Sequence, residues 1–268
     1  MGGSIMSVDP VLAHERPGAY EPMGLTAENV AEKYGFSRQE QDIFGVASQN
    51  KAEAAIKAGR FKEQIVPLTI RLPGVDDKGN PTIVEEVFEV DEGMRPGVTL
   101  ESVSGLRPAF KPKGTVTAAN SSQMSDGAAA AMIMSRQKAE ALGLPILGIF
   151  RSFAVAGVAN EFMGLGPIKA IPKALKLAGK KLEDMELIEL NEAFASQALA
   201  CIKELGINTE ITNVNGGAIA LGHPLGCTGA KLTTQLLYEM GYRNLRWGLV
   251  SMCIGFGMGA AAVFERPV

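Results

Sequence analysis

The sequence has little of what disulfide frameworks, membrane spans and nucleic-acid surfaces are built from. Its three cysteines form neither an even set nor a C-x-x-C pair, which favours a reducing compartment. No apolar run is long enough to span a membrane, and no leader of the secretory type is visible, so we expect a cytoplasmic protein. The net charge of −3 gives no basic footprint, which argues against nucleic acid or an anionic membrane as a partner.

Histidine is as scarce as cysteine, and we predict no metal site. One of the two histidines, His14, lies in an irregular stretch and is expected at the surface. Cys201 falls in the apolar stripe of a predicted helix and is expected in the core. Cys227 follows a proline in a glycine-rich turn, where a structural role is favoured over a chemical one.

What the sequence does contain is ordinary for a globular protein with a large core. Of its 268 residues, 46% are apolar and 21% are charged, which fits one large domain or two smaller ones.

The first part of the chain lacks a regular strand–helix rhythm. Ser37 and Glu40 have the spacing of a capping box, which predicts a helix over 37–58. A turn signal at 76–80 separates two strand-like runs and predicts a hairpin. The remaining expectations for this part are an irregular lead-in at 1–22, strands at 64–71 and 82–90, a loop at 107–114, a buried strand at 128–135 and a helix at 136–142.

The second part alternates regularly between strands and helices, in the order βαβαβαββ. This order predicts a mostly parallel sheet covered by helices. We expect strands at 146–155, 186–190, 211–214, 247–253 and 259–265, and helices at 167–178, 193–205 and 228–240.

Three polar side chains stand where strands of this sheet are predicted to end. Asn191 follows strand 186–190, His223 follows strand 211–214 and Cys253 ends strand 247–253. Because ligands of open α/β sheets bind at the carboxyl ends of strands, an amide, an imidazole and a thiol can converge there.

Each of the three also has a purely structural interpretation. His223, in a turn between five glycines, could be a structural histidine at the start of a helix. Asn191 could simply cap the following helix. Cys253 could be an inert buried thiol, although the glycine-rich backbone around it offers amides to an oxyanion. The turn at 217–222 has the spacing of a phosphate loop, but His223-Pro224 stands where Lys-Ser/Thr is required, which excludes a triphosphate site.

Taken together, these motifs resemble the signatures of the thiolase family, the 3-ketoacyl-CoA and acetyl-CoA acyltransferases. The C-terminal ones are Asn191-Glu192-Ala193-Phe194, the glycine-flanked His223 and the Cys253 loop. In the first half, 22–31 resembles the loop that covers coenzyme A, and 120–127 resembles the turn that contacts pantetheine. The resemblance implies an α/β fold of the layered αβαβα type.

The chain departs from the family in one large respect. The family's nucleophilic cysteine lies in a Cys-x-Ser/Gly-Gly type turn, and none of the three cysteines here does. Met1 resembles an internal methionine of a longer relative. We therefore expect an incomplete first core domain and a complete C-terminal one, divided as a loop domain at 1–124, a remnant of the N-terminal core domain at 125–144 and the C-terminal core domain at 145–268.

The resemblance also implies roles for residues. His223 activates the missing nucleophile, Asn191 holds an oxyanion-site water, Cys253 is the general acid and base, and Gly255 lends a backbone amide. We expect the Cys253 thiol to need only a modest downward pKa shift to exchange protons near neutral pH. Ser122 is implied to contact pantetheine, with Met23, Phe110, Met163 and Phe194 lining the pantetheine and acyl path, although Phe110 and Met163 could equally be core.

The function implied is thiolytic cleavage of a 3-ketoacyl-CoA, or the reverse condensation, with coenzyme A as a substrate and no bound cofactor. Pro22 before Met23 leans towards the degradative class of fatty-acid β-oxidation. The partners implied are acyl-CoA substrates and either a second copy, as homodimer or homotetramer, or a chain that supplies the missing half. The alternatives are a non-catalytic CoA-binding or scaffolding fragment, and a ketoacyl synthase, which usually has histidine where Cys253 stands.

Overall fold

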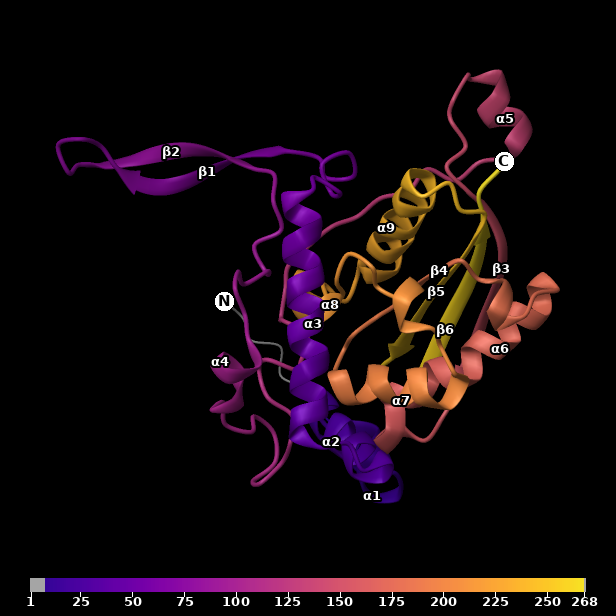
Figure 1. Cartoon of the computed structure of the whole chain (residues 1–268). Helices are drawn as coiled ribbons and strands as arrows, with labels where there is room; N and C mark the ends of the chain where they lie inside the picture. The colour runs from indigo at the N-terminus through magenta and orange to yellow at the C-terminus, as the bar shows by residue number, and fades with distance from the viewer. Residues whose placement is uncertain (1–7, 268) are drawn as a thin grey trace.

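The computed structural model describes residues 8–267, whose largest sheet has four strands and lies in the second half of the chain (Figure 1). The strand order is β3 (Ile149–Gly157), β6 (Met258–Glu265), β5 (Trp247–Ile254) and β4 (Leu187–Leu190). Only β4 and β5 are parallel, and the other two pairings are antiparallel. The prediction of a mostly parallel sheet was therefore wrong, because the three residues at 255–257 are too short for a parallel crossover.

Helices cover both faces of this sheet, as predicted (Figure 1). Successive strand residues point to opposite faces, so Leu187 packs against α9 (Thr228–Tyr242). Its neighbour Ile188 packs instead against α6 (Gly166–Ala178) and α7 (Ala195–Leu205). The three predicted helices of this half are thus confirmed, each beginning within two residues of its expected start.

The strand predicted at 211–214 is not formed. It is reduced to one bridge between Ile188 and Thr212, after the 3-10 helix η4 (Thr209–Ile211). Asn213 has φ +45°, and its side-chain amide bonds both the N–H and the C=O of Leu190 at 2.9 and 2.8 Å. The Asn213 side chain thus makes the hydrogen bonds to β4 that the backbone of a neighbouring strand would make. The apolar pattern of the sequence alone does not reveal this substitution.

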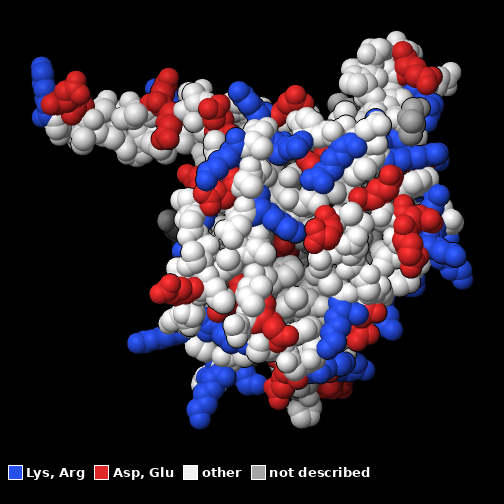
Figure 2. Space-filling model, viewed as in Figure 1, with Lys and Arg blue, Asp and Glu red and all other residues white. Residues whose placement is uncertain are grey.

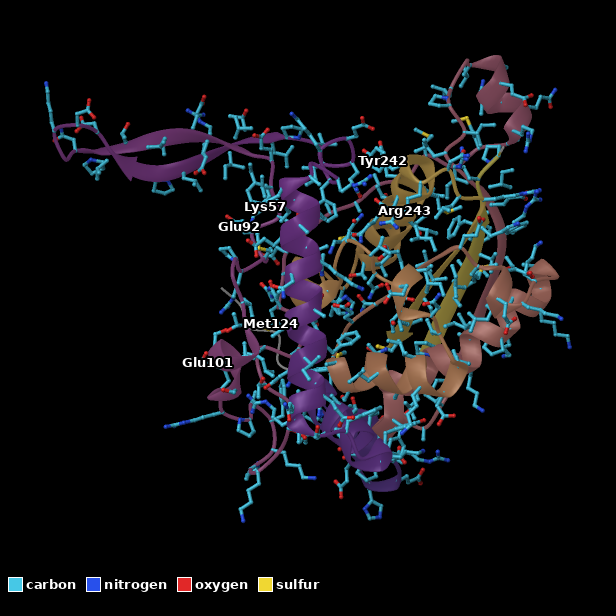
Figure 3. All side chains as sticks on the ribbon, viewed as in Figure 1. Lys57, Glu92, Glu101, Met124, Tyr242 and Arg243 are labelled. Carbon is cyan, nitrogen blue, oxygen red and sulfur yellow. The ribbon has the colours of Figure 1, made fainter. Side chains whose placement is uncertain are left out.

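Two helices of the first half pack beside the sheet layer, α2 (Met23–Tyr34) and α3 (Arg38–Lys57). The predicted capping box is confirmed, since Ser37 and Glu40 bond each other's backbone N–H at 2.8 and 3.2 Å. Helix α3 packs against α7 and against α8 (Ala218–Leu221). Its last residue Lys57 lies at the same end of the molecule as Tyr242 of α9 (Figure 3), where the Arg60 guanidinium lies over the Tyr242 ring.

The predicted hairpin is also confirmed. Strands β1 (Leu68–Val75) and β2 (Pro81–Phe88) pair antiparallel and project from the body of the molecule (Figure 1). The loop predicted at 107–114 contains no helix or strand.

Two expectations for the first half were wrong. The lead-in is not irregular throughout, because Asp9 caps the short helix α1 (Pro10–Glu15), which 3-10 helix η1 (Pro17–Tyr20) follows; residues 1–7 lie outside the described part. Residues 122–135 form no helix or strand, and Met132 and Ile133 are 84% and 88% exposed, since no neighbouring strand in the described part pairs with them. The remaining elements are α4 (Leu100–Ser104), α5 (Arg136–Ala141), η2 (Asn160–Leu165) and η3 (Leu182–Asp184).

The charge distribution agrees with the small net charge. On the face shown in Figure 2, lysine and arginine are interspersed with aspartate and glutamate and form no patch of one sign. Between residues 8 and 267, no helix is both long and apolar enough to cross a bilayer. The three-part domain division stays a prediction.

Candidate active site

Asn191 follows β4 directly and is fully buried. Its backbone N–H donates to Ser251 O of β5 at 2.9 Å, which places it beside the neighbouring strand. Within residues 8–267, neither side-chain atom of its amide has a hydrogen-bond partner. The helix-cap interpretation is wrong, because α7 begins at Ala195 with Phe194 in the cap position. A buried amide without partners costs stability, so this side chain adds no hydrogen bond to the fold within the described residues.

Cys253 lies near the end of β5, next to the strand that Asn191 follows. It is buried and packs with Met163, Ala193 and Phe194. Burial raises the pKa of its thiol to about 11. The expectation of a modestly lowered pKa is therefore wrong for this structure, and the thiol is a protonated group at neutral pH.

The turn after Cys253 has a backbone conformation that requires glycine at one position. Gly257 has φ +76°, and a Cβ there would lie 2.4 Å from Val158 O. Gly255 is less confined, because a Cβ there would meet only the terminal methyl of Met23, at 3.9 Å. The predicted amide donor Gly255 thus faces the start of α2.

His223 lies five residues before α9, and its ring reaches back to that helix. Nδ1 is 2.7 Å from Oγ1 of Thr228, the first residue of α9. Within the described part of the chain, Nε2 has no hydrogen-bond partner. Burial, and secondarily the Lys231 ammonium, lower the pKa of the imidazole. A neutral ring with one free nitrogen is what a general base needs.

Three of the four predicted acyl-path residues, Phe110, Phe194 and Met163, form one apolar cluster. The rings of Phe110 and Phe194 meet edge to face with centroids 6.0 Å apart. Phe194 also contacts the cluster of Met163 and Cys253. Met23 and Phe110 are both 43% exposed, whereas Met163 is 5% exposed, so the cluster runs from the surface inwards.

A single strand-like segment, residues 121–123, joins this cluster to His223. Ser121 forms a bridge with Phe194, and Ser122 N–H donates to Ala193 O at 2.9 Å. Gln123 O in turn accepts from the backbone N–H of His223 at 3.4 Å. All nine predicted residues therefore belong to one connected region; the convergence of Asn191, His223 and Cys253 on a single point stays a prediction.

Some residues that hold this region together were assigned no role from the sequence. The buried Glu192 carboxylate accepts from Ser48 Oγ at 2.6 Å and from Asn213 Nδ2 at 2.9 Å. Lys231 donates to the carbonyls of Leu221 and Gly222, just before His223. The sequence did contain a signal for such residues, namely a charged side chain within a segment of small or apolar residues, as in Asn191-Glu192-Ala193-Phe194.

The positions of Cys201 and His14 agree with their predicted burial and exposure. Cys201 is fully buried in the core under α6 and α7, and burial raises its pKa to about 12. Cys227 is half-buried at the cap position of α9, and His14 is exposed. In the described residues, no group of three or more His, Cys, Asp or Glu side chains could hold a metal ion.

Two surface hollows in the described residues lie away from this region. One, of about 390 Å³, lies between α6 and the segment after it. The other, of about 270 Å³, lies near the end of α3 and the base of the hairpin. Neither contains a predicted site residue.

Comparisons with known proteins match both parts of the chain. The family model for the thiolase N-terminal domain matches residues 13–137, and that for the thiolase C-terminal domain matches residues 144–266. The chain is 57% identical over 265 residues to the 3-ketoacyl-CoA thiolase of Bacillus subtilis, covering 99% of this chain and 68% of that protein.

Solved structures agree. The dimeric peroxisomal thiolase of Saccharomyces cerevisiae superposes with a TM-score of 0.86 at 43% identity, covering 98% of this chain and 64% of that one. Human mitochondrial 3-ketoacyl-CoA thiolase in complex with CoA superposes with a TM-score of 0.81 at 37% identity, covering 92% and 59%. The chain thus spans less than two thirds of the length of these two structures.

Proposed function

The chain belongs to the thiolase family, and we propose that it carries the proton-transfer and oxyanion-binding groups for acyl transfer between coenzyme A thioesters. Its α/β thiolase fold agrees with the solved structures it resembles. The observation that carries the proposal is the buried amide of Asn191, which is unpartnered in the described residues and follows β4, the strand paired with the Cys253 strand β5. Most buried side-chain amides in proteins are hydrogen-bonded, which supports a role for this one in binding a water or ligand.

In the proposed reaction, a cysteine thiolate attacks the keto carbon of a 3-ketoacyl-CoA. The C–C bond breaks, and the acetyl-CoA enolate leaves. Cys253 donates its proton to the enolate carbon, which suits a thiol whose pKa is about 11 because the carbanion is a stronger base. The Cys253 thiolate then takes the proton of an incoming coenzyme A thiol, which attacks the acyl group.

Asn191 holds a water that, with His223, binds the enolate oxygen. Gly255 donates its backbone N–H to the oxygen of the acylated cysteine. One such donor contributes roughly 2.7–4 kcal/mol to the transition state. His223 accepts the proton of the attacking thiol. The lowered pKa of the imidazole keeps the ring neutral beforehand, so that it can accept this proton.

We propose that the attacking cysteine is not among the 268 residues and comes from another part of the assembly. Cys201 and Cys253 are buried with pKa values raised to about 12 and 11, the opposite of what a nucleophile needs. Burial also raises the pKa of Cys227, which caps α9.

Coenzyme A thioesters are the proposed substrates, because a relative's structure was solved with CoA and the apolar cluster begins at the surface. The pantetheine arm lies against Ser122, Met23 and Phe110, and the reacting end meets Phe194 and Met163. An assembly with a second copy stays a prediction. The cytoplasmic location also stays a prediction, since relatives include peroxisomal enzymes.

The test is thiolysis of acetoacetyl-CoA by the chain, alone and mixed with the N-terminal part of the Bacillus subtilis relative that its match leaves uncovered. The chain alone should give no acyl adduct by intact-mass spectrometry and no turnover. The mixture should turn over, and Cys253→Ala should lower its rate by about 10²–10⁴.

The competing hypothesis is a non-catalytic CoA-binding protein. It predicts CoA binding by calorimetry but no turnover in the mixture. Turnover by the chain alone would instead show that one of its own cysteines is the nucleophile.

A further inference from the structure

The hydroxyl of Thr228 has two polar neighbours. It lies 2.7 Å from His223 Nδ1 and 2.9 Å from Pro224 O, and the side chain is 1% exposed. Thr228 opens α9, so its hydroxyl bonds the carbonyl four residues back, as threonines at helix starts do. The direction in which the Thr228 hydroxyl proton points therefore decides which ring nitrogen of His223 carries a hydrogen.

The hydroxyl has one proton to give, and a carbonyl can only accept. If that proton went to the imidazole, the oxygens of Thr228 and Pro224 would face each other at 2.9 Å with no proton between them, which is repulsive. The proton therefore goes to Pro224 O, and Thr228 Oγ1 accepts from Nδ1–H of His223.

We propose that Thr228 is a positioning residue that fixes His223 as the Nδ1–H tautomer and leaves Nε2 as the basic, unprotonated atom. Free imidazole in water prefers the opposite tautomer, so the contact selects the less common form. The catalytic use of Nε2 rests on the proposed function, whereas the tautomer does not.

Lys231 supports the same arrangement from the next turn of α9. Its ammonium donates to Leu221 O at 3.2 Å and Gly222 O at 3.1 Å, which fixes the backbone just before the histidine. Gly222 has φ +82° and passes so close to Ser125 that a Cβ would lie 2.2 Å from its hydroxyl oxygen. The ring is thus held at its backbone and at Nδ1, and only Nε2 is free to act.

The test is long-range ¹H–¹⁵N correlation NMR of the ¹⁵N-labelled chain above the titration of the ring. The chain has only two histidines, so His14→Gln assigns both rings. We expect the His223 Nδ1 signal in the protonated range and the Nε2 signal in the unprotonated range. The reverse pattern would overturn the proposal.

Variants separate this role from a merely structural one. Thr228→Val should move the ring towards the Nε2–H form, and Thr228→Ser should restore Nδ1–H. The matched control is Thr233→Val, because Thr233 bonds Gly229 O at 2.8 Å in the same way but has no histidine beside it. A tautomer that is unchanged in Thr228→Val would contradict the proposal.

Steady-state kinetics then test whether the tautomer of His223 affects catalysis. In the active mixture, Thr228→Val should lower kcat at least tenfold with KM unchanged, and Thr228→Ser should recover most of it. If the NMR pattern is as expected but kcat is unchanged, the tautomer stands and the proposed role of His223 fails.

Discussion

At the scale of single residues, burial decides what each candidate group can do. It leaves the amide of Asn191 without a partner in the described residues, raises the pKa of the Cys253 thiol and lowers that of the His223 imidazole. The sequence alone indicated the residue types and their order along the chain. It could not give these environments, because they depend on segments far away, such as 121–123 and α2.

Asn191→Leu should maintain or raise stability and strongly lower activity. Leucine removes an unpartnered buried amide that costs about 1–3 kcal/mol, so the melting temperature should rise or stay constant. Turnover in the active mixture should fall by about 10²–10³. Calorimetry and steady-state kinetics measure the two effects.

The control is Asn120→Leu. Asn120 is equally buried, but its amide bonds Thr117 N, Asp42 Oδ1 and Thr115 O at 2.8–3.1 Å. This variant should lose several kcal/mol. A comparable loss for Asn191→Leu would mean that the Asn191 amide has structural partners after all.

At the scale of elements, local signals were predictable and pairings were not. The Ser37–Glu40 capping box is a contact within four residues, and it placed the start of α3 correctly. Residues 211–214 form no strand because the Asn213 side chain bonds the backbone of β4. Residues 128–135 would form a strand only if another strand lay beside them. Such partners lie elsewhere in the chain, so apolar pattern alone misled.

Strand β4 also carries a buried carboxyl, Glu189, that faces α9 and accepts from Gln235 Nε2 at 3.1 Å. Burial, with the nearby Glu192, raises its pKa from an ordinary 4.5 to about 8. Between these values the folded state holds a proton that the unfolded state has lost. The free energy of unfolding should therefore fall as pH rises from 4.5 towards 8.

Glu189→Gln should remove this pH dependence, since glutamine keeps an acceptor for Gln235 and never ionises. The melting temperature of the variant relative to the natural chain should be higher near pH 8.5 than near pH 5. The exposed Glu183→Gln controls for net charge. An equal difference at both pH values would show that Glu189 is ionised in the folded protein.

At the scale of the whole molecule, apolar side chains gather in residues 122–135 and on the outer face of β3. Met124, labelled in Figure 3, is 103% exposed. On β3, Phe150, Phe153 and Val155 are all more than half exposed. Exposed apolar patches of this kind favour association.

The chain should therefore self-associate in a concentration-dependent way, as sedimentation velocity can measure. Met132→Lys with Ile133→Glu should weaken association without lowering the melting temperature, because both side chains are more than 80% exposed. Val66→Lys, at the equally exposed base of the hairpin, is the control. If it alone abolishes association, the hairpin is the contact.

The most direct test of the central claim is exchange of the C-2 hydrogens of acetyl-CoA with deuterium from solvent. Every group proposed for that proton transfer lies in this chain, so it should catalyse exchange without thiolysis at alkaline pH, where the Cys253 thiol begins to ionise. Cys253→Ala should slow exchange by about 10²-fold, whereas Cys201→Ala should not. Exchange no faster than in buffer, or unaffected by Cys253→Ala, would contradict the account.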